Sequence, residues 1–208
     1  FSNAKRIYSF SSNVFSLKKI DSFAFYNCEN LQNIIIKQAE KLKIGDFCFA
    51  ENKKLSTIDI SCEKIKIGNN CFQNCELLTN VLLTISNKVT LKSKSFKGCR
   101  NLTHLAIESK EINVENECFE NIKSIGFIAN SILLGNNFVQ NCSLLSFVVI
   151  KSNQNIKILT YMFQGCNNLK NVTIETLSNL ILNTNCFAQK RKLESIELCG
   201  KNIDIKNE

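Results

Sequence analysis

The chain has 208 residues, which is enough to bury a hydrophobic core without metal ions or disulfide bonds. Hydrophobic residues make up 44% of it and charged residues 21%, as in ordinary soluble globular proteins. The longest apolar stretch is about seven residues, whereas a transmembrane helix needs roughly 20, so we expect no membrane span in this segment. The net charge of +8 permits an anionic partner but does not require one.

One aromatic position recurs along the whole chain at intervals of 20 to 24 residues, with valine replacing phenylalanine once. We call it position zero of each repeat. Its occurrences are Phe1, Phe25, Phe49, Phe72, Phe96, Phe119, Val139, Phe163 and Phe187. Such a period is typical of repeat proteins, in which each unit buries its apolar face only by stacking on its neighbours.

Each repeat carries two short strand patterns after position zero. Apolar residues follow it by six, nine and eleven positions, as in "CFQNCELLTNVLL" from Cys71, and the last two alternate as in a half-buried strand. A second alternating pair follows, as in "KLKIG" from Lys41 and "KIKIG" from Lys64. The pattern therefore predicts two strands in each unit.

A polar residue precedes position zero by three places, and it is always Ser, Thr, Asp or Asn, the types that cap helix N-termini. We therefore predict a short helical turn that begins at this residue in each repeat. The predicted caps are Ser22, Asp46, Asn69, Ser93, Asn116, Asn136, Thr160 and Thr184. One repeat is three residues shorter than its neighbours, which predicts a local irregularity between Phe119 and Asn121.

The string L-x-x-I-x-I, followed by a second strand and then A/C-F-x-x-C, resembles the BspA-like subclass of leucine-rich repeats across residues 1–208. That family often has proline after the main strand, whereas this chain has none. The resemblance implies an α/β repeat solenoid: a right-handed leucine-rich-repeat stack with parallel strands, short helical turns and about 23–24 residues per repeat. We expect a single domain of about 8–9 repeats over residues 1–208. Neither end shows a polar capping repeat, so we also expect the domain to be a fragment of a longer chain.

Eleven cysteines raise the question of a metal or redox site. Nine of them fall one residue before or three residues after position zero, where other repeats place Ala, Ile or Phe, so these are packing positions. A zinc site needs four converging donors, whereas these thiols are expected in two rows along the stack. Bridges such as Cys75–Cys99 or Cys142–Cys166 stay open, but buried free thiols are the preferred interpretation. We predict no metal and no cofactor.

The sequence does not predict an enzyme. Its single histidine, His104, falls on an outward position of the main strand, where it is most simply a surface residue. The resemblance implies no catalytic residues either, since that family binds proteins or host matrix.

Lysines recur at the outward positions of the second strand pattern, and stacking would align them into one basic row, which we call the lysine ladder. Its members are Lys19, Lys41, Lys43, Lys64, Lys66 and Lys88. Like charges on adjacent strands repel, which favours an anionic ligand such as a sulfated glycan, an acidic protein or a lipid headgroup. The alternative is a solvated edge in a lysine-rich chain. Nucleic acid is disfavoured, because no aromatic residues are interleaved with the lysines.

The outward positions of the main strand are mostly small and polar, with a few apolar exceptions. Phe147 and Val149 share one strand, and Ile128 lies near the edge of the preceding one. Exposed apolar clusters often mark protein contacts, although a neighbouring loop could equally cover these three.

These patterns together predict a non-catalytic protein-binding or adhesion module whose partner is a protein, an extracellular-matrix component or a glycan. The alternative is a structural scaffold within a larger intracellular assembly. The two differ in compartment: the family resemblance favours the cell surface or secretion, and the unpaired cysteines favour the cell interior.

Overall fold

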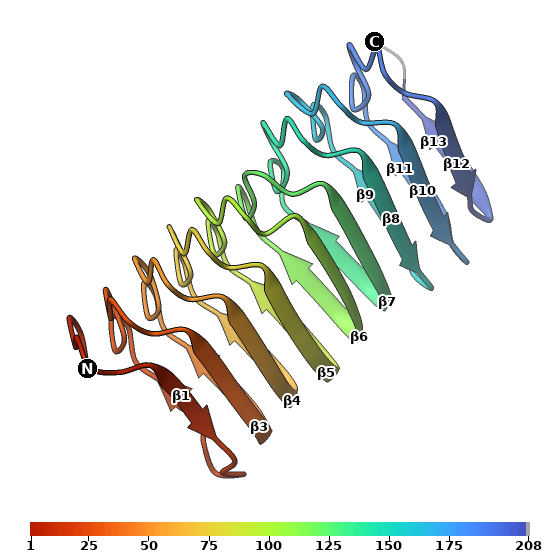
Figure 1. Ribbon diagram of the computed structural model, residues 1–208. Coiled ribbons are helices and arrows are strands. Elements are labelled where there is room, and N and C mark those ends of the chain that lie inside the picture. The colour runs from red at the N-terminus through yellow and green to blue at the C-terminus, as the bar shows by residue number, and fades with distance from the viewer. Residues whose placement is uncertain (207–208) are drawn as a thin grey trace.

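The computed structural model describes residues 1–206 as an elongated parallel β-solenoid of about nine turns (Figure 1). Along this part of the chain the strands are β1 (Ser9–Ser12), β2 (Lys19–Ile20), β3 (Asn33–Ile44), β4 (Thr57–Ile67), β5 (Asn80–Leu91), β6 (His104–Val114), β7 (Ser124–Leu134), β8 (Phe147–Ser152), β9 (Ile156–Ile158), β10 (Asn171–Thr176), β11 (Asn179–Leu182), β12 (Ser195–Cys199) and β13 (Asn202–Ile205).

All the strand pairs are parallel and join neighbouring turns. Within residues 1–206 one ten-stranded sheet runs in the order β1-β3-β4-β5-β6-β7-β8-β10-β12, with β2 also paired to β3, and β13-β11-β9 form a second sheet. The two strands predicted for each repeat are fused in β3 to β7 and separate from β8 onward. A bulge between Ile36 and Ala39 of β3, and another between Cys62 and Lys64 of β4, mark where the two halves meet.

The predicted helical turns are wrong, because no helix occurs in the described residues; consecutive tight turns surround position zero instead. Packed helices need 8–10 Å between their axes, whereas adjacent turns of this stack are held at a strand spacing of about 4.8 Å. Two residues in most turns also adopt a positive φ that a right-handed helix excludes, for example Phe47 (53°) and Glu51 (63°).

Some amides of these turns close the local turn, as Ala50 does by donating to Phe47 at 3.2 Å, and others bond to the next repeat. The N–H of Phe47 donates to the carbonyl of Asn69 at 2.9 Å, and that of Glu51 donates to Gln73 at 2.8 Å. A predicted cap, Asp46, likewise accepts the backbone N–H of Asn69 at 2.8 Å through Oδ1. The capping residue types therefore serve as bridges between repeats.

The core is a column of position-zero rings flanked by the apolar strand residues. Phe49 and Phe72 are fully buried, and their stacked rings are nearly parallel, with an interplanar angle of 3° and centroids 5.5 Å apart. The neighbouring spacings in this part of the column are 5.1 Å between Phe25 and Phe49 and 5.2 Å between Phe72 and Phe96. The hydrophobic effect and ring stacking therefore act on the same side chains in successive repeats.

The shortened repeat interrupts this regularity, as the sequence predicts. Bends at Glu120 and Asn121 replace the turns seen in the other repeats, and the spacing from Phe96 to Phe119 widens to 6.1 Å. The next member of the column is Val139, and ring stacking resumes between Phe163 and Phe187 at 5.2 Å.

The pairing of the main sheet is interrupted one repeat earlier, at a seam between β5 and β6. The register of β5 with β6 covers only Lys88–Leu91 against Glu111–Val114, so the first halves of these strands are unpaired with each other. Val81 at this seam is only partly buried, whereas its equivalents Ile34 and Ile58 are fully buried. The sequence pattern of β5 gives no sign of this break.

Removing a ring from the centre of the column should be costly. We expect Phe72→Ala to lower the free energy of unfolding by about 3 to 5 kcal/mol, because it leaves a cavity between two stacked rings. Urea denaturation followed by circular dichroism measures this change. The matched control is Phe147→Ala, an exposed phenylalanine whose removal should cost less than about 1 kcal/mol; equal losses would contradict the importance of the column.

Candidate binding surfaces

A groove crosses the main sheet where its strands bend, and we call it the main-sheet groove. It runs over β1 and β3 to β7 with a volume of about 1730 Å³, and the bulges of β3 and β4 lie on it. Bulges bend a strand and strengthen its local twist, so their alignment in neighbouring repeats produces a continuous hollow. The groove could not be predicted from the sequence, because the apolar pattern indicates two separate strands where β3 and β4 are each one long strand with a bulge.

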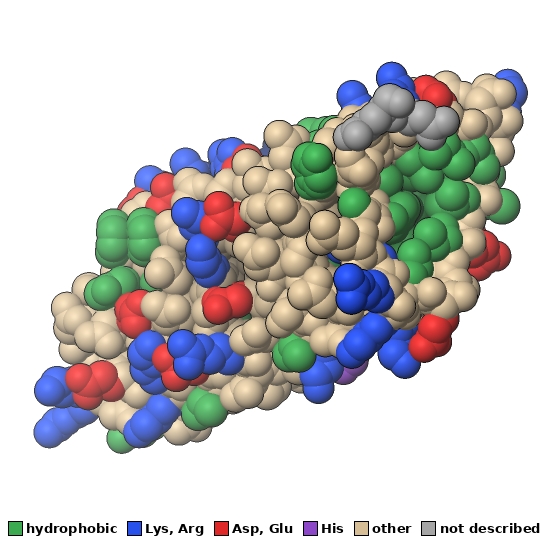
Figure 2. All heavy atoms as spheres, turned by 90° about the horizontal axis from the view of Figure 1, so that it is seen from above, with side chains coloured by type: hydrophobic (Ala, Val, Ile, Leu, Met, Phe, Trp, Pro, Cys, Tyr) green, Lys and Arg blue, Asp and Glu red, His purple; other side chains and the backbone are tan. Residues whose placement is uncertain are grey.

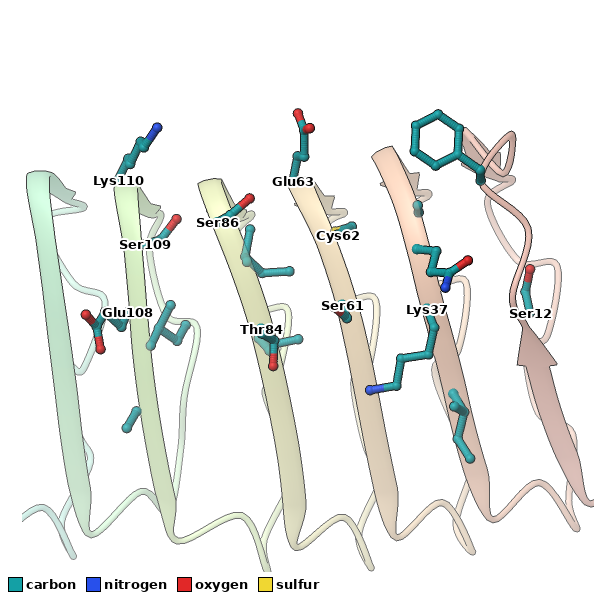
Figure 3. A pocket seen from close by; sticks show the side chains of 18 of the residues that line it. Ser12, Lys37, Ser61, Cys62, Glu63, Thr84, Ser86, Glu108, Ser109 and Lys110 are labelled. Atoms are coloured by element: carbon teal, nitrogen blue, oxygen red, sulfur yellow. The ribbon is translucent and has the colours of Figure 1, made fainter.

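Small hydroxyl side chains, a few charges and apolar residues such as Phe15 and Ile35 line the main-sheet groove. Figure 3 shows Ser61 of β4, Thr84 of β5 and Glu108 of β6 in a row across the strands, and Ser61 is in register with Thr84. Lys37 reaches from β3 towards β4, where it forms an ion pair with Asp59. Such a lining offers hydrogen bonds to an extended ligand, and it contains no histidine.

The three apolar candidates are close together but do not form one contiguous patch. Ile128 and Phe147 are 44% and 50% exposed, so no loop covers them, whereas Val149 is half-buried. In the sheet Val149 lies beside Gly126, and Ile128 lies beside Lys151, so the two apolar residues are diagonal neighbours. Ile128 lines the main-sheet groove and the other two flank it.

A second apolar surface lies at the C-terminal end, where Figure 2 shows hydrophobic side chains gathered. The terminal strands β12 and β13 leave Ile196, Ile203 and Ile205 exposed. Their counterparts one turn earlier, such as Val172 and Leu182, are buried beneath these strands. This surface therefore consists of core positions of the last described turn.

The lysine ladder is present on the second halves of the strands. Lys41, Lys64 and Lys88 are in register on β3, β4 and β5, and a parallel row contains Lys19, Lys43 and Lys66. Lys64 is half-buried and the other five are exposed. The rows border a hollow of about 520 Å³, which is lined by Lys18 rather than Lys19. The sequence analysis missed Lys18, because it precedes the alternating pair.

Carboxylates neutralise only part of the lysine ladder. Lys19 pairs with Asp21, Lys41 lies 3.6 Å from Glu40, and Lys88 lies 2.8 Å from Glu111 at the end of its row. The hydrogen bond and charge of Lys88 lower the pKa of Glu111 from its ordinary value, with a smaller contribution from Lys64. Within residues 1–206, Lys43, Lys64 and Lys66 have no carboxylate within 4.0 Å.

The cysteines are free, and ten of the eleven are buried in the described part of the chain. Those three residues after position zero act as hydrogen-bond donors to the position-zero carbonyl of the preceding repeat. Cys75 Sγ lies 3.1 Å from the carbonyl oxygen of Phe49, and Cys99 Sγ lies 3.0 Å from that of Phe72. In one repeat Asn52 takes this place and donates to Phe25 at 2.8 Å. Asn52 was the available sequence signal that most of these positions hold a hydrogen-bond donor.

Burial keeps these thiols protonated. Desolvation raises the pKa of Cys75 and of Cys48 to about 12, and it raises the pKa of Cys71 well above its ordinary value. A thiolate is the species that attacks disulfides and binds metals, so these residues are poor nucleophiles. Within residues 1–206, no three His, Cys, Asp or Glu side chains are grouped closely enough to hold a metal ion.

The single histidine is a surface residue, as predicted. His104 is exposed on β6, and its Nδ1 lies 2.6 Å from the hydroxyl of Ser124 in the adjacent strand.

No helix in the described residues is long and apolar enough to cross a membrane.

Stacked parallel strands, a 20- to 24-residue period and a core built mainly of isoleucine and leucine define a solenoid of the leucine-rich-repeat type. The model of the BspA-type leucine-rich-repeat region matches six copies over residues 1–126 and 89–208. The chain therefore belongs to the BspA-type leucine-rich-repeat family, whose members are repeat proteins commonly used for protein binding. No curated protein matches the chain.

Three solved leucine-rich-repeat structures are similar to this chain at low identity. A leucine-rich cell surface protein from Faecalibacterium prausnitzii is 16% identical, with 96% of this chain and 83% of that chain covered and a TM-score of 0.30. The leucine-rich repeat protein of T. pallidum is 15% identical, with 93% of this chain and 73% of that chain covered and a TM-score of 0.30. A leucine-rich-repeat protein from Bacteroides ovatus is 16% identical, with 92% of this chain and 74% of that chain covered and a TM-score of 0.30.

The burial of the thiols predicts how they react. In the native protein we expect a soluble aromatic disulfide reagent to modify Cys199 rapidly and the ten buried cysteines slowly. Unfolding without a reductant should release all eleven thiols, which the absorbance of the displaced leaving group counts. A count below eleven in the unfolded protein would reveal a bridge and contradict this description.

The raised thiol pKa values also predict alkaline instability. Above pH 9 the unfolded chain loses the Cys75 proton, whereas the folded chain keeps it until about pH 12, so the free energy of unfolding falls across this range. Urea denaturation at increasing pH should show a shallower decline for Cys75→Ala than for the wild type. The control Cys199→Ala removes an exposed thiol and should leave the slope unchanged. An unchanged slope in Cys75→Ala would contradict the assignment.

Proposed function

We propose that this protein is a non-catalytic binding module that contacts a protein or extracellular-matrix partner through its main sheet, in an adhesion role at the cell surface. The observation that carries the proposal is the main-sheet groove, which crosses six strands and has exposed apolar side chains within and beside it. An anionic ligand would engage the separate lysine ladder.

The groove suits an extended macromolecular partner better than a small molecule. It is long and open, and its small hydroxyl residues leave the sheet surface accessible to another chain. Ile128 at the groove and Phe147 beside it supply the apolar contacts that interface centres are enriched in. Binding energy at such surfaces is concentrated in a few residues, and exposed aromatic side chains are among the commonest.

A structural scaffold within an intracellular assembly is the second candidate. The ten buried free thiols favour it, because reduced cysteines are typical of reducing compartments. In that role the same sheet would pack permanently against a neighbouring subunit instead of an extracellular partner.

Beads coated with the protein test the adhesion proposal. We expect them to be retained on a decellularised matrix whose glycosaminoglycans have been enzymatically removed, so that protein contacts remain. The double variant Ile128→Ser and Phe147→Ser should lose most of this retention, by about tenfold or more, because two exposed apolar contacts are removed.

The matched control is Leu77→Ser with Leu133→Ser, which removes two exposed apolar side chains outside the main-sheet groove. This control should be retained like the wild type. Equal losses in both double variants would contradict the assignment of the site, and no retention of the wild type would contradict adhesion.

A further inference from the structure

The arrangement of charges elsewhere in the stack makes the lysine ladder an exception. Of the twelve ion pairs among the described residues, nine join residues 20 to 24 positions apart, which means adjacent repeats. Lys151 with Glu175 and Lys170 with Glu194 are examples, both at 2.8–2.9 Å. The stack thus usually places opposite charges in register.

The lysine ladder, by contrast, places like charges in register. Four like-charge pairs face each other in register: Lys19 with Lys43, Lys41 with Lys64, Lys43 with Lys66, and Lys64 with Lys88. Like charges directly opposite on neighbouring strands destabilise a sheet. No carboxylate lies within 4.0 Å of Lys43, Lys64 or Lys66 in residues 1–206, so an external anion is the available neutralising group.

The spacing of the lysines in the ladder indicates the shape of a ligand that would fit it. Each row follows the solenoid axis with a step of about 4.8 Å between strands, and the two rows are separated by two residues along each strand, roughly 6.6 Å. The hollow of about 520 Å³ lies between these rows. A short linear polymer in this hollow would meet Lys41, Lys64 and Lys88 of one row and Lys43 and Lys66 of the other, and Lys18 and Glu40 also line it.

We propose that the lysine ladder binds a linear sulfated polysaccharide along the solenoid axis. Lysine ammonium groups suit scattered sulfates, because they act as mobile point charges and need no paired oxygens. The proposal deepens the binding function proposed above, but its residues are not among those that line the main-sheet groove, and it does not depend on a protein partner there.

Other polyanions fit the surface less well. The hollow contains no aromatic side chain on which nucleic-acid bases could stack. Its apolar members, Leu42 and Ile65, are each 2% exposed, so it has no side chain that could insert into a membrane. Both rows end at the next strand, where Thr90 and Glu111 replace lysine, which limits the ligand to a short segment.

The test is fluorescence polarisation with a labelled, fully sulfated heparin octasaccharide at low ionic strength. We expect saturable binding that weakens with added salt, because the contacts are exposed charges. The triple variant Lys43→Gln, Lys64→Gln and Lys66→Gln should weaken binding by about tenfold or more, since each lysine near an anionic ligand contributes substantially. Its melting temperature should be equal or higher, because three repelling charges are gone.

The matched control is Lys123→Gln, Lys157→Gln and Lys201→Gln, which changes the net charge equally away from the ladder. This control should bind the octasaccharide like the wild type. The Ile128→Ser and Phe147→Ser variant should also bind it like the wild type, so the experiment tests the lysine ladder independently of the main-sheet groove. Equal weakening in both lysine triples would show a net-charge effect and overturn the proposal.

Competing probes identify the chemistry of the ligand. The desulfated octasaccharide should not compete, and polyphosphate or polyglutamate of equal charge should compete at least about tenfold more weakly. Equal competition by polyphosphate or polyglutamate would overturn the assignment to sulfated polysaccharide. No binding of the sulfated octasaccharide would overturn the site itself.

Discussion

In-register parallel pairing between adjacent repeats is the constraint on which the rest of this structure depends. It holds equivalent atoms of successive turns about 4.8 Å apart, so whatever one turn contains must stack on its own copy. Flat rings satisfy this requirement, as Phe49 and Phe72 do at 5.5 Å. Helices do not satisfy it, because they pack at 8–10 Å. The tight turns around position zero follow from the same geometry.

The constraint also explains the cysteines. In six of the described repeats the position-zero carbonyl accepts a hydrogen bond from a side chain of the following repeat, whereas Ile122 takes the donor's place after Phe96. Cys99 donates this bond from within the core, because a thiol is a weak donor that is still small and apolar enough to bury. Asn52 donates the same bond, but its Oδ1 is left without a partner. The repeated thiols are therefore structural, and their chemistry is suppressed by burial.

Most of the fold could be predicted from sequence, because stacking forces a strict period on the residues that face the core. The positions of Phe72 and Cys75, and the irregularity near Phe119, follow from that period. The helical turns could not be predicted correctly, because capping residues such as Asp46 bond equally well to an adjacent repeat. The main-sheet groove and Lys18 were missed because both depend on how neighbouring strands bend and align.

The sequence by itself determined the family and most of the residues that lie in the core, because stacked repeats bury the same apolar positions in each unit. It also placed the lysines of the ladder in adjacent repeats. The tertiary structure alone decided that the turns are not helical, that Ile128 and Val149 are diagonal neighbours, and that the bulges align into a groove. These features depend on strand register and on side chains meeting across repeats, which a local pattern does not contain.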